Sequence, residues 1–136
     1  MRRVVILAAL LTASACGTKV QWAEEPLERI RAEAKAGRVL LVDASHPEAW
    51  YKGHVPEALS LPLASLRSGK VRLGSMYFGR AVFVYAESGD HAVEAARLLK
   101  ARGADARPLR QGFSQFASQT RLPTPPPSAG SPSEER

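Results

Sequence analysis

The residues AESGDH at positions 86–91 bring a hydroxyl, two carboxylates and an imidazole into one short turn. An apolar run precedes them and an alanine-rich helical pattern follows, so the turn is predicted to join a buried strand to a helix. Backbone N–H groups at a helix start favour an anion, yet Glu87 and Asp90 are themselves negative. We therefore expect these two carboxylates to satisfy the helix N-terminus and to close the loop to anionic substrates.

Ser88 and His91 allow two interpretations of the same turn. A serine hydroxyl beside an imidazole is a pair that hydrolases use as nucleophile and general base. A serine that opens a helix is also a preferred N-cap, because its oxygen accepts a hydrogen bond from a backbone N–H. We favour the cap, which fully explains the residue type. A general acid–base role for His91 lacks a nucleophile or second supporting group.

Metal binding is not predicted. The histidines are His46, His54 and His91, without the close His-x₃-His spacing of a metal site, and the single cysteine is Cys16. We expect no metal and no other cofactor.

The surrounding elements are read from hydrophobic periodicity and from helix stop signals. Strands alternate with helices, which predicts an α/β domain with a parallel sheet. Ligands in such sheets lie beyond the carboxyl ends of the strands, which is where residues 43–45 and 86–91 fall. We expect a helix at 23–36, a short helix opened by an S-x-x-E capping box at Ser45–Glu48 and ended at Gly53, and a helix from 92 that ends at Gly103. The expected strands cover 38–45, 58–63, 81–86 and 105–109. Residues 64–79 are read as a helical turn and a loop, and 113–116 as a helical turn.

The N-terminus resembles an export signal. Two arginines precede the apolar run at 4–11, which is too short to span a bilayer, and small residues follow. The ASA at 13–15 allows ordinary cleavage after Ala15, which gives a secreted or periplasmic soluble protein. TASAC also resembles a bacterial lipobox, which implies a lipid on Cys16, although Ala13 stands where leucine is usual. We favour the lipoprotein of the bacterial cell envelope, because a lone exported thiol is otherwise unexplained.

The remaining segments divide the chain into one domain with flanking regions. We expect a signal peptide at 1–15, a lipid-anchored tether at 16–22, the domain at 23–118 and a disordered Pro/Ser-rich tail at 119–136. The net charge of +6 on 136 residues invites a nucleic-acid function. The basic residues are scattered and lack interleaved aromatics, so we expect no nucleic-acid partner.

Two segments together resemble the rhodanese homology domain. Residues 39–63 match its D-x-R and G-H-[IV]-P-x-A pattern at Asp43, Gly53–Pro56, Ala58 and Pro62. Residues 82–116 resemble its second half, and 109–116 are similar to its L-x-G-G-x-x-x-W, with Gln111, Gly112 and Phe116. The resemblance covers about 23–118 and implies a three-layer α/β fold with about five short parallel strands and helices on both faces. It also implies that His54 bonds within its turn, and that Trp50 or Tyr51 packs the short helix onto the sheet. The other reading of these two residues and Tyr77 is an exposed surface for a partner.

The same resemblance argues against catalysis. Active members carry a C-[RK]-x-G-x-R loop whose cysteine forms a persulfide, and here the corresponding residues are Ala86, Glu87 and His91. Ser45 replaces the arginine of D-x-R, while Ser88 and Gly89 keep the turn. An alanine methyl cannot act as a nucleophile, and Cys16 is far away in the sequence. Phosphatases of this fold need the same cysteine and a longer loop.

The sequence thus predicts a catalytically inactive rhodanese-like module that binds an unknown protein partner and is anchored to a membrane through Cys16. Two alternatives stay open. The loop at 86–91 could serve an enzyme or small-ligand binder that works without a thiol, through His91, Glu87 and Asp90. The protein could also be the non-catalytic partner of an active sulfurtransferase.

Overall fold

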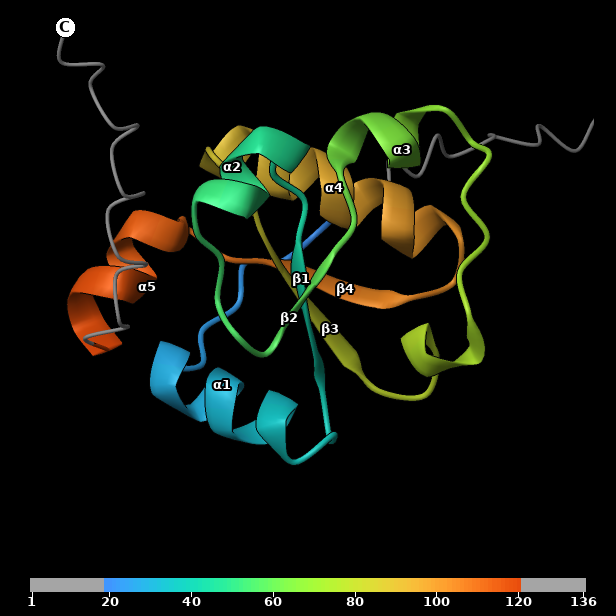
Figure 1. Ribbon diagram of the computed structural model, residues 1–136. Coiled ribbons are helices and arrows are strands. Elements are labelled where there is room, and N and C mark those ends of the chain that lie inside the picture. The colour runs from blue at the N-terminus through green and yellow to red at the C-terminus, as the bar shows by residue number, and fades with distance from the viewer. Residues whose placement is uncertain (1–18, 121–136) are drawn as a thin grey trace, which may run out of the picture.

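Four parallel strands form the central sheet of residues 19–120, the part of the chain that this computed structural model describes (Figure 1). Their order is β2-β1-β3-β4, with β1 at Leu40–Asp43, β2 at Ala58–Ser60, β3 at Ala81–Tyr85 and β4 at Asp105–Pro108. The predicted α/β class and parallel sheet are confirmed. The expectation of about five strands is replaced by four within the described residues.

The N-terminal segment lies where a fifth strand would extend the sheet. Among the described residues, one backbone hydrogen bond joins it to β4, from the Ala23 N–H to the Pro108 carbonyl (2.9 Å). Proline has no N–H for a sheet ladder, so Pro108 suits the edge position of β4. One such bond does not make a strand, which accounts for the lower strand count.

Helices cover both faces of this sheet (Figure 1). The structure has α1 at Leu27–Lys35, α2 at Pro47–Lys52, α3 at Leu63–Arg67, the 3₁₀ turn η1 at Ser75–Tyr77, α4 at Gly89–Ala101 and α5 at Phe113–Thr120. Val42, Val82 and Val84 pack in the same cluster as α3 and α4. Leu41, Phe83 and Tyr85 point to the other face, with α1 and α5. Burial on both faces explains why these strands read as continuous apolar runs.

Two helices differ in length from the sequence expectation. Helix α1 begins at Leu27, not Ala23, because Pro26 is its N-cap and a proline disfavours helical geometry in the residue before it. Helix α5 runs from Phe113 to Thr120, not to 116, and so passes the expected domain end at 118. The segment 64–79 resolves into most of α3, a loop and η1.

The predicted signal peptide at 1–15, Cys16 and the tail beyond residue 120 lie outside the described residues. Within residues 19–120, none of the helices has the length and apolar character needed to cross a bilayer.

Candidate functional site

The carboxyl ends of β1 and β3 meet at the point where the chain changes direction along the sheet. From β1 the chain passes first to β2 on one side, and later to β3 on the other. Asp43 is paired in register with Tyr85, and the Ala44 N–H donates to the Tyr85 carbonyl (2.9 Å). The loops that follow both strands therefore lie side by side, as expected for the ligand position of an open α/β sheet.

Ser88 caps α4 in the predicted manner. Its hydroxyl oxygen accepts a hydrogen bond from the His91 backbone N–H (3.2 Å), while its own backbone is extended. The hydroxyl thus meets the backbone, not the imidazole, of His91, which is exposed. Within residues 86–91 this geometry supports the cap and provides no nucleophile–base pair.

Glu87 is placed differently from the sequence expectation. Its Oε1 accepts a hydrogen bond from the His46 backbone N–H (2.8 Å), so the carboxylate serves the start of α2, not that of α4. Glu87 precedes the cap residue Ser88, and its side chain leaves α4 toward the neighbouring β1–α2 loop. Asp90 does lie in the first turn of α4, where a carboxylate is favourable to the helix dipole.

The expected Ser45–Glu48 capping box does not form. The Ser45 N–H donates to Asp43 Oδ1 (2.8 Å), a turn in which an aspartate binds the backbone two residues ahead. That turn moves the helix start by one residue, and His46 becomes the N-cap of α2. Its Nδ1 accepts a hydrogen bond from the Glu48 N–H (3.4 Å), and Pro47 occupies the first helical position.

Tyr85 links three segments beneath the loop, and the sequence analysis missed it. Its hydroxyl accepts a hydrogen bond from the Val55 N–H (3.1 Å) and lies near the carboxylate of Asp43. Burial, together with the nearby Asp43 charge, raises the pKa of Tyr85 far above its ordinary value. A hydroxyl at the end of an otherwise apolar strand was the available signal, because a buried tyrosine needs a polar partner.

His54 bonds locally, as the family resemblance implied. Its Nδ1 donates to the Trp50 carbonyl (2.9 Å), and its ring stacks on the Trp50 indole at 3.5 Å between centroids. Trp50 packs against the α1 and α5 side of the core, whereas Tyr51 is 86% exposed. Tyr77 is half-buried against the opposite core cluster. Within residues 19–120, no three His, Cys, Asp or Glu side chains converge as a metal site would require.

Trp22, in the expected tether, packs beside the loop. A Cβ built on Gly89 would lie 3.4 Å from the Trp22 ring, so the indole covers the start of α4. The Arg110 guanidinium carbon lies 4.4 Å from the centroid of the same ring, a cation–π contact. The sequence analysis placed residues 16–22 apart from the domain and so did not find this contact.

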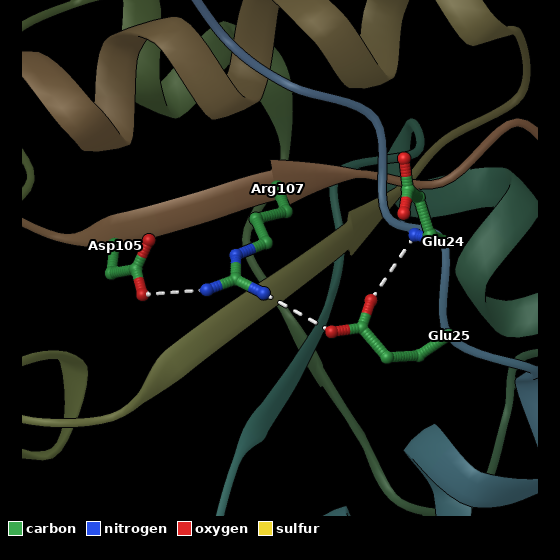
Figure 2. Close-up of polar contacts among 4 residues, drawn as sticks. All are labelled: Glu24, Glu25, Asp105 and Arg107. Carbon is green, nitrogen blue, oxygen red and sulfur yellow. Dashed lines mark hydrogen bonds and ion pairs between the residues drawn. The ribbon is translucent and has the colours of Figure 1, made fainter.

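A hollow of about 580 Å³ lies between the N-terminal segment and the edge of β4. Figure 2 shows some of its charged side chains: Arg107 donates to Glu25 (3.1 Å) and Asp105 (3.3 Å), and the other Glu25 oxygen accepts from the Glu24 N–H (3.1 Å). Arg107 therefore already binds two carboxylates. The charge of Arg107 is therefore balanced within the hollow, whereas Lys100 and Arg110, which also line it, contact the Lys19 carbonyl and the Trp22 ring.

A scan against protein-family models matches residues 23–119 to the rhodanese-like domain. No curated protein sequence matches the chain significantly. Among solved structures, the human single-domain sulfurtransferase TSTD1 is similar at 19% identity and a TM-score of 0.58, over 68% of this chain and 93% of that one.

Two bacterial structures are also similar. A rhodanese homologue from Thermus thermophilus has 25% identity and a TM-score of 0.50, over 71% of this chain and 99% of that one. The reduced CoADR-RHD protein of Bacillus anthracis has 20% identity and a TM-score of 0.57, over 73% of this chain and 17% of that one. Similarity at these identities concerns the fold, and it leaves the chemistry to be argued from the loop.

Proposed function

This chain belongs to the rhodanese-like domain family, and we propose that it is a catalytically inactive member that works as a binding module, anchored by a lipid at Cys16 in a bacterial cell envelope. The observation that carries the proposal is Ala86. The sequence resemblance aligns this residue with the sulfur-accepting cysteine, and it lies at the carboxyl end of β3 with 2% of its surface exposed.

The covalent step of sulfur transfer has no acceptor in this loop. A thiolate must attack the outer sulfur of the donor to form a persulfide, with sulfite leaving when thiosulfate is the donor. Residues 19–120 contain no cysteine. The Ser88 hydroxyl caps α4, and the raised pKa of Tyr85 keeps that phenol protonated.

The charge of the loop also disfavours the anions that a sulfurtransferase binds. Where the family resemblance places a basic residue, Glu87 is instead held against the His46 N–H. Asp90 adds a second negative charge in the first turn of α4. Both carboxylates would repel thiosulfate, and the Glu87 bond already uses a backbone donor at the mouth of the loop.

Activity measurements with single and combined substitutions test the inactive state. We expect no thiocyanate formation from thiosulfate and cyanide by the unmodified protein. Ala86→Cys should restore little, whereas Ala86→Cys with Glu87→Arg and His91→Arg should restore more, because the anion then meets cations. Ala86→Ser is the matched control. Robust sulfur transfer by the unmodified protein would overturn the proposal.

A protein partner is favoured over a small ligand by the surface of α2. Tyr51 is 86% exposed on this helix, whose start is tied to the loop through His46 and Glu87. Exposed tyrosines often become anchors of protein interfaces. In-cell cross-linking of the lipoprotein, with mass spectrometry of captured proteins, should therefore lose its main product in Tyr51→Ala. Saturable small-ligand binding that His91→Ala abolishes would favour the enzyme or ligand-binder alternative instead.

Mass spectrometry of the N-terminal peptide tests the anchor separately. We expect a diacylglyceryl group on Cys16 after cleavage, and release of the protein from membranes in Cys16→Ser. An unmodified thiol, or cleavage after Ala15 with a soluble product, would contradict lipid anchoring without touching the argument about catalysis.

A further inference from the structure

The segment between α3 and β3 exposes large apolar side chains among cations. Met76 and Phe78 are 47% and 42% exposed, and Lys70 and Arg72 are exposed on the residues just before η1. This segment joins the amino end of β3, so it lies at the end of the sheet away from the loop at 86–91 (Figure 1).

The charge of this stretch of the chain is strongly one-sided. Residues 58–86 contain four basic side chains and no Asp or Glu. Arg67 is paired with Glu94, whereas Arg80 donates to the Gly37 carbonyl (2.8 Å) and keeps its full charge. Arg102 likewise donates to backbone carbonyls, those of Val71 and Leu66. Among residues 19–120, Lys70, Arg72, Arg80 and Arg102 have no carboxylate partner.

The described chain also begins at this end. The Lys19 carbonyl accepts a hydrogen bond from Lys100 Nζ (2.9 Å), and Lys100 lies in the last turn of α4. Just beyond that turn, a Cβ built on Gly103 would lie 3.6 Å from the Phe78 ring. Cys16 is three residues before Lys19, and three extended residues span at most about 10 Å. A lipid on Cys16 would therefore hold this end of the domain close to the bilayer.

We propose that this surface, the basic aromatic end formed by Lys70, Arg72, Met76, Phe78, Arg80 and Arg102, rests on an anionic lipid bilayer. Cations at such a surface are attracted to lipid phosphates, while neighbouring apolar side chains enter the headgroup region. The inference rests on the lipid anchor of the proposed function. It assigns an orientation to that anchor, with the loop at 86–91 and Tyr51 facing away from the membrane toward a partner.

A fluorescent label at residue 76 tests this contact in the full processed protein. Because lipidation blocks the single natural thiol, Met76→Cys provides one free site for an environment-sensitive nitrobenzoxadiazole label. The labelled protein is reconstituted into vesicles of phosphatidylethanolamine with phosphatidylglycerol. We expect blue-shifted emission and quenching by spin-labelled lipid at residue 76, and neither at the matched control Tyr51→Cys.

Charge variants separate a specific contact from mere proximity. Each cation near an anionic surface contributes a factor of about five, so Lys70→Gln with Arg72→Gln should lower the ratio of contacting to detached domain about 25-fold. Phosphatidylcholine vesicles should weaken the signal in the same direction, because their surface carries no net negative charge. Salt at 1 M should do so as well, because the screening length then falls to about 3 Å.

Several outcomes would overturn the proposal. Equal emission at residues 76 and 51 in anionic vesicles would show that the domain does not rest on this end. A shift at residue 76 caused by duplex DNA or by an acidic protein, but not by vesicles, would assign the basic aromatic end to that partner. Mass spectrometry of the Cys16 peptide is read on the same sample, so a missing lipid is distinguished from an anchored protein that orients differently.

Discussion

The hydroxyl of Tyr85 holds together the segments that shape the loop. It is fully buried, it accepts from the Val55 N–H, and it lies near the carboxylate of Asp43, which is 2% exposed. Asp43 in turn binds the Ser45 N–H. The ends of β1 and β3 and the turn at 53–56 are thus joined through one phenol. This network gives rigidity to the base of the loop at 86–91.

Tyr85→Phe should destabilise the fold by about 1–3 kcal/mol, because it leaves the buried Val55 N–H without an acceptor. Equilibrium urea unfolding measures the change. Tyr51→Phe is the matched control, since Tyr51 is 86% exposed, and it should change the free energy of unfolding by less than about 0.5 kcal/mol. Equal effects of the two substitutions would contradict the network.

Glu57 links the turn after Pro56 to α1 through a bidentate bond with Arg31 (2.9 and 3.1 Å). Burial alone would raise the pKa of Glu57, but hydrogen bonds from Arg31 and from the backbone, with the charges of Arg31 and Lys35, lower it below the ordinary 4.5. A lowered folded-state pKa means that this stabilisation is complete above the ordinary value. It is lost as the pH falls through the lowered pKa.

Glu57→Gln should therefore cost about 0.5–1 kcal/mol at neutral pH, and this difference from the unmodified protein should shrink on acidification. Urea unfolding at a series of pH values measures it. Arg31→Gln should abolish the same pH-dependent component. A difference that grows as the pH falls would show that folding does not lower the pKa of Glu57.

The order of elements could be predicted from the sequence because hydrophobic periodicity and the helix cap and stop residues indicated the same elements. The strands at 40–43 and 81–85 are buried on both faces, so they read as unbroken apolar runs. Helix α4 has a cap at Ser88 and a small-residue face, and both are visible in the sequence. The position of the N-terminal segment at the edge of the sheet could not be predicted, because the single bond of Ala23 to Pro108 depends on tertiary placement.

The site could be predicted in position but not in its hydrogen bonds. Topology alone placed residues 43–45 and 86–91 together at the carboxyl ends of β1 and β3. The partners of Glu87 and Ser45 could not be found locally, because Glu87 bonds to a residue 41 positions away and Asp43 takes the N–H of Ser45. Trp22 was missed for a similar reason, since its contacts with Gly89 and Arg110 are far away in sequence.

The junction between the loop and α5 depends on the absence of a side chain at Gly112. A Cβ at this position would lie 3.0 Å from the Ala86 carbonyl oxygen, a backbone atom that cannot move without shifting the loop. The Gly112 N–H also donates to Gln115 Oε1 (2.8 Å) at the start of α5. The start of α5 thus packs directly against Ala86 in the loop.

Gly112→Ala should destabilise the protein by about 1–3 kcal/mol, the usual cost of overpacking. Gly74→Ala is the control, because nothing lies within 4 Å of its built Cβ and its φ of −69° suits alanine. Thermal unfolding followed by circular dichroism compares the two. Similar melting temperatures for both variants would show that the loop yields to accommodate the methyl group.

The whole molecule has two ends with different surfaces. The carboxyl end of the sheet carries the acidic loop at 86–91 and the exposed Tyr51, and the amino end carries exposed Met76 and Phe78 among unpaired cations. The N-terminal segment runs between them, with Lys19 at the last turn of α4 and Trp22 beside the loop. Its attachment to the domain therefore decides how an anchor at Cys16 would orient the rest.

The contact of Trp22 with Arg110 tests that attachment, because Trp22 belongs to the N-terminal segment and Arg110 to the loop that follows β4. A cation–π pair at a distance of 4.4 Å at the surface contributes about 0.5–1 kcal/mol. A double-mutant cycle with Trp22→Ala and Arg110→Gln should show this coupling in urea unfolding, and Trp22→Ala should speed trypsin cleavage after Lys19. Strictly additive free energies with unchanged cleavage would mean that the segment is held by its other contacts, among them the Ala23, Glu25 and Lys100 bonds, and that the Trp22 ring contributes nothing to its attachment.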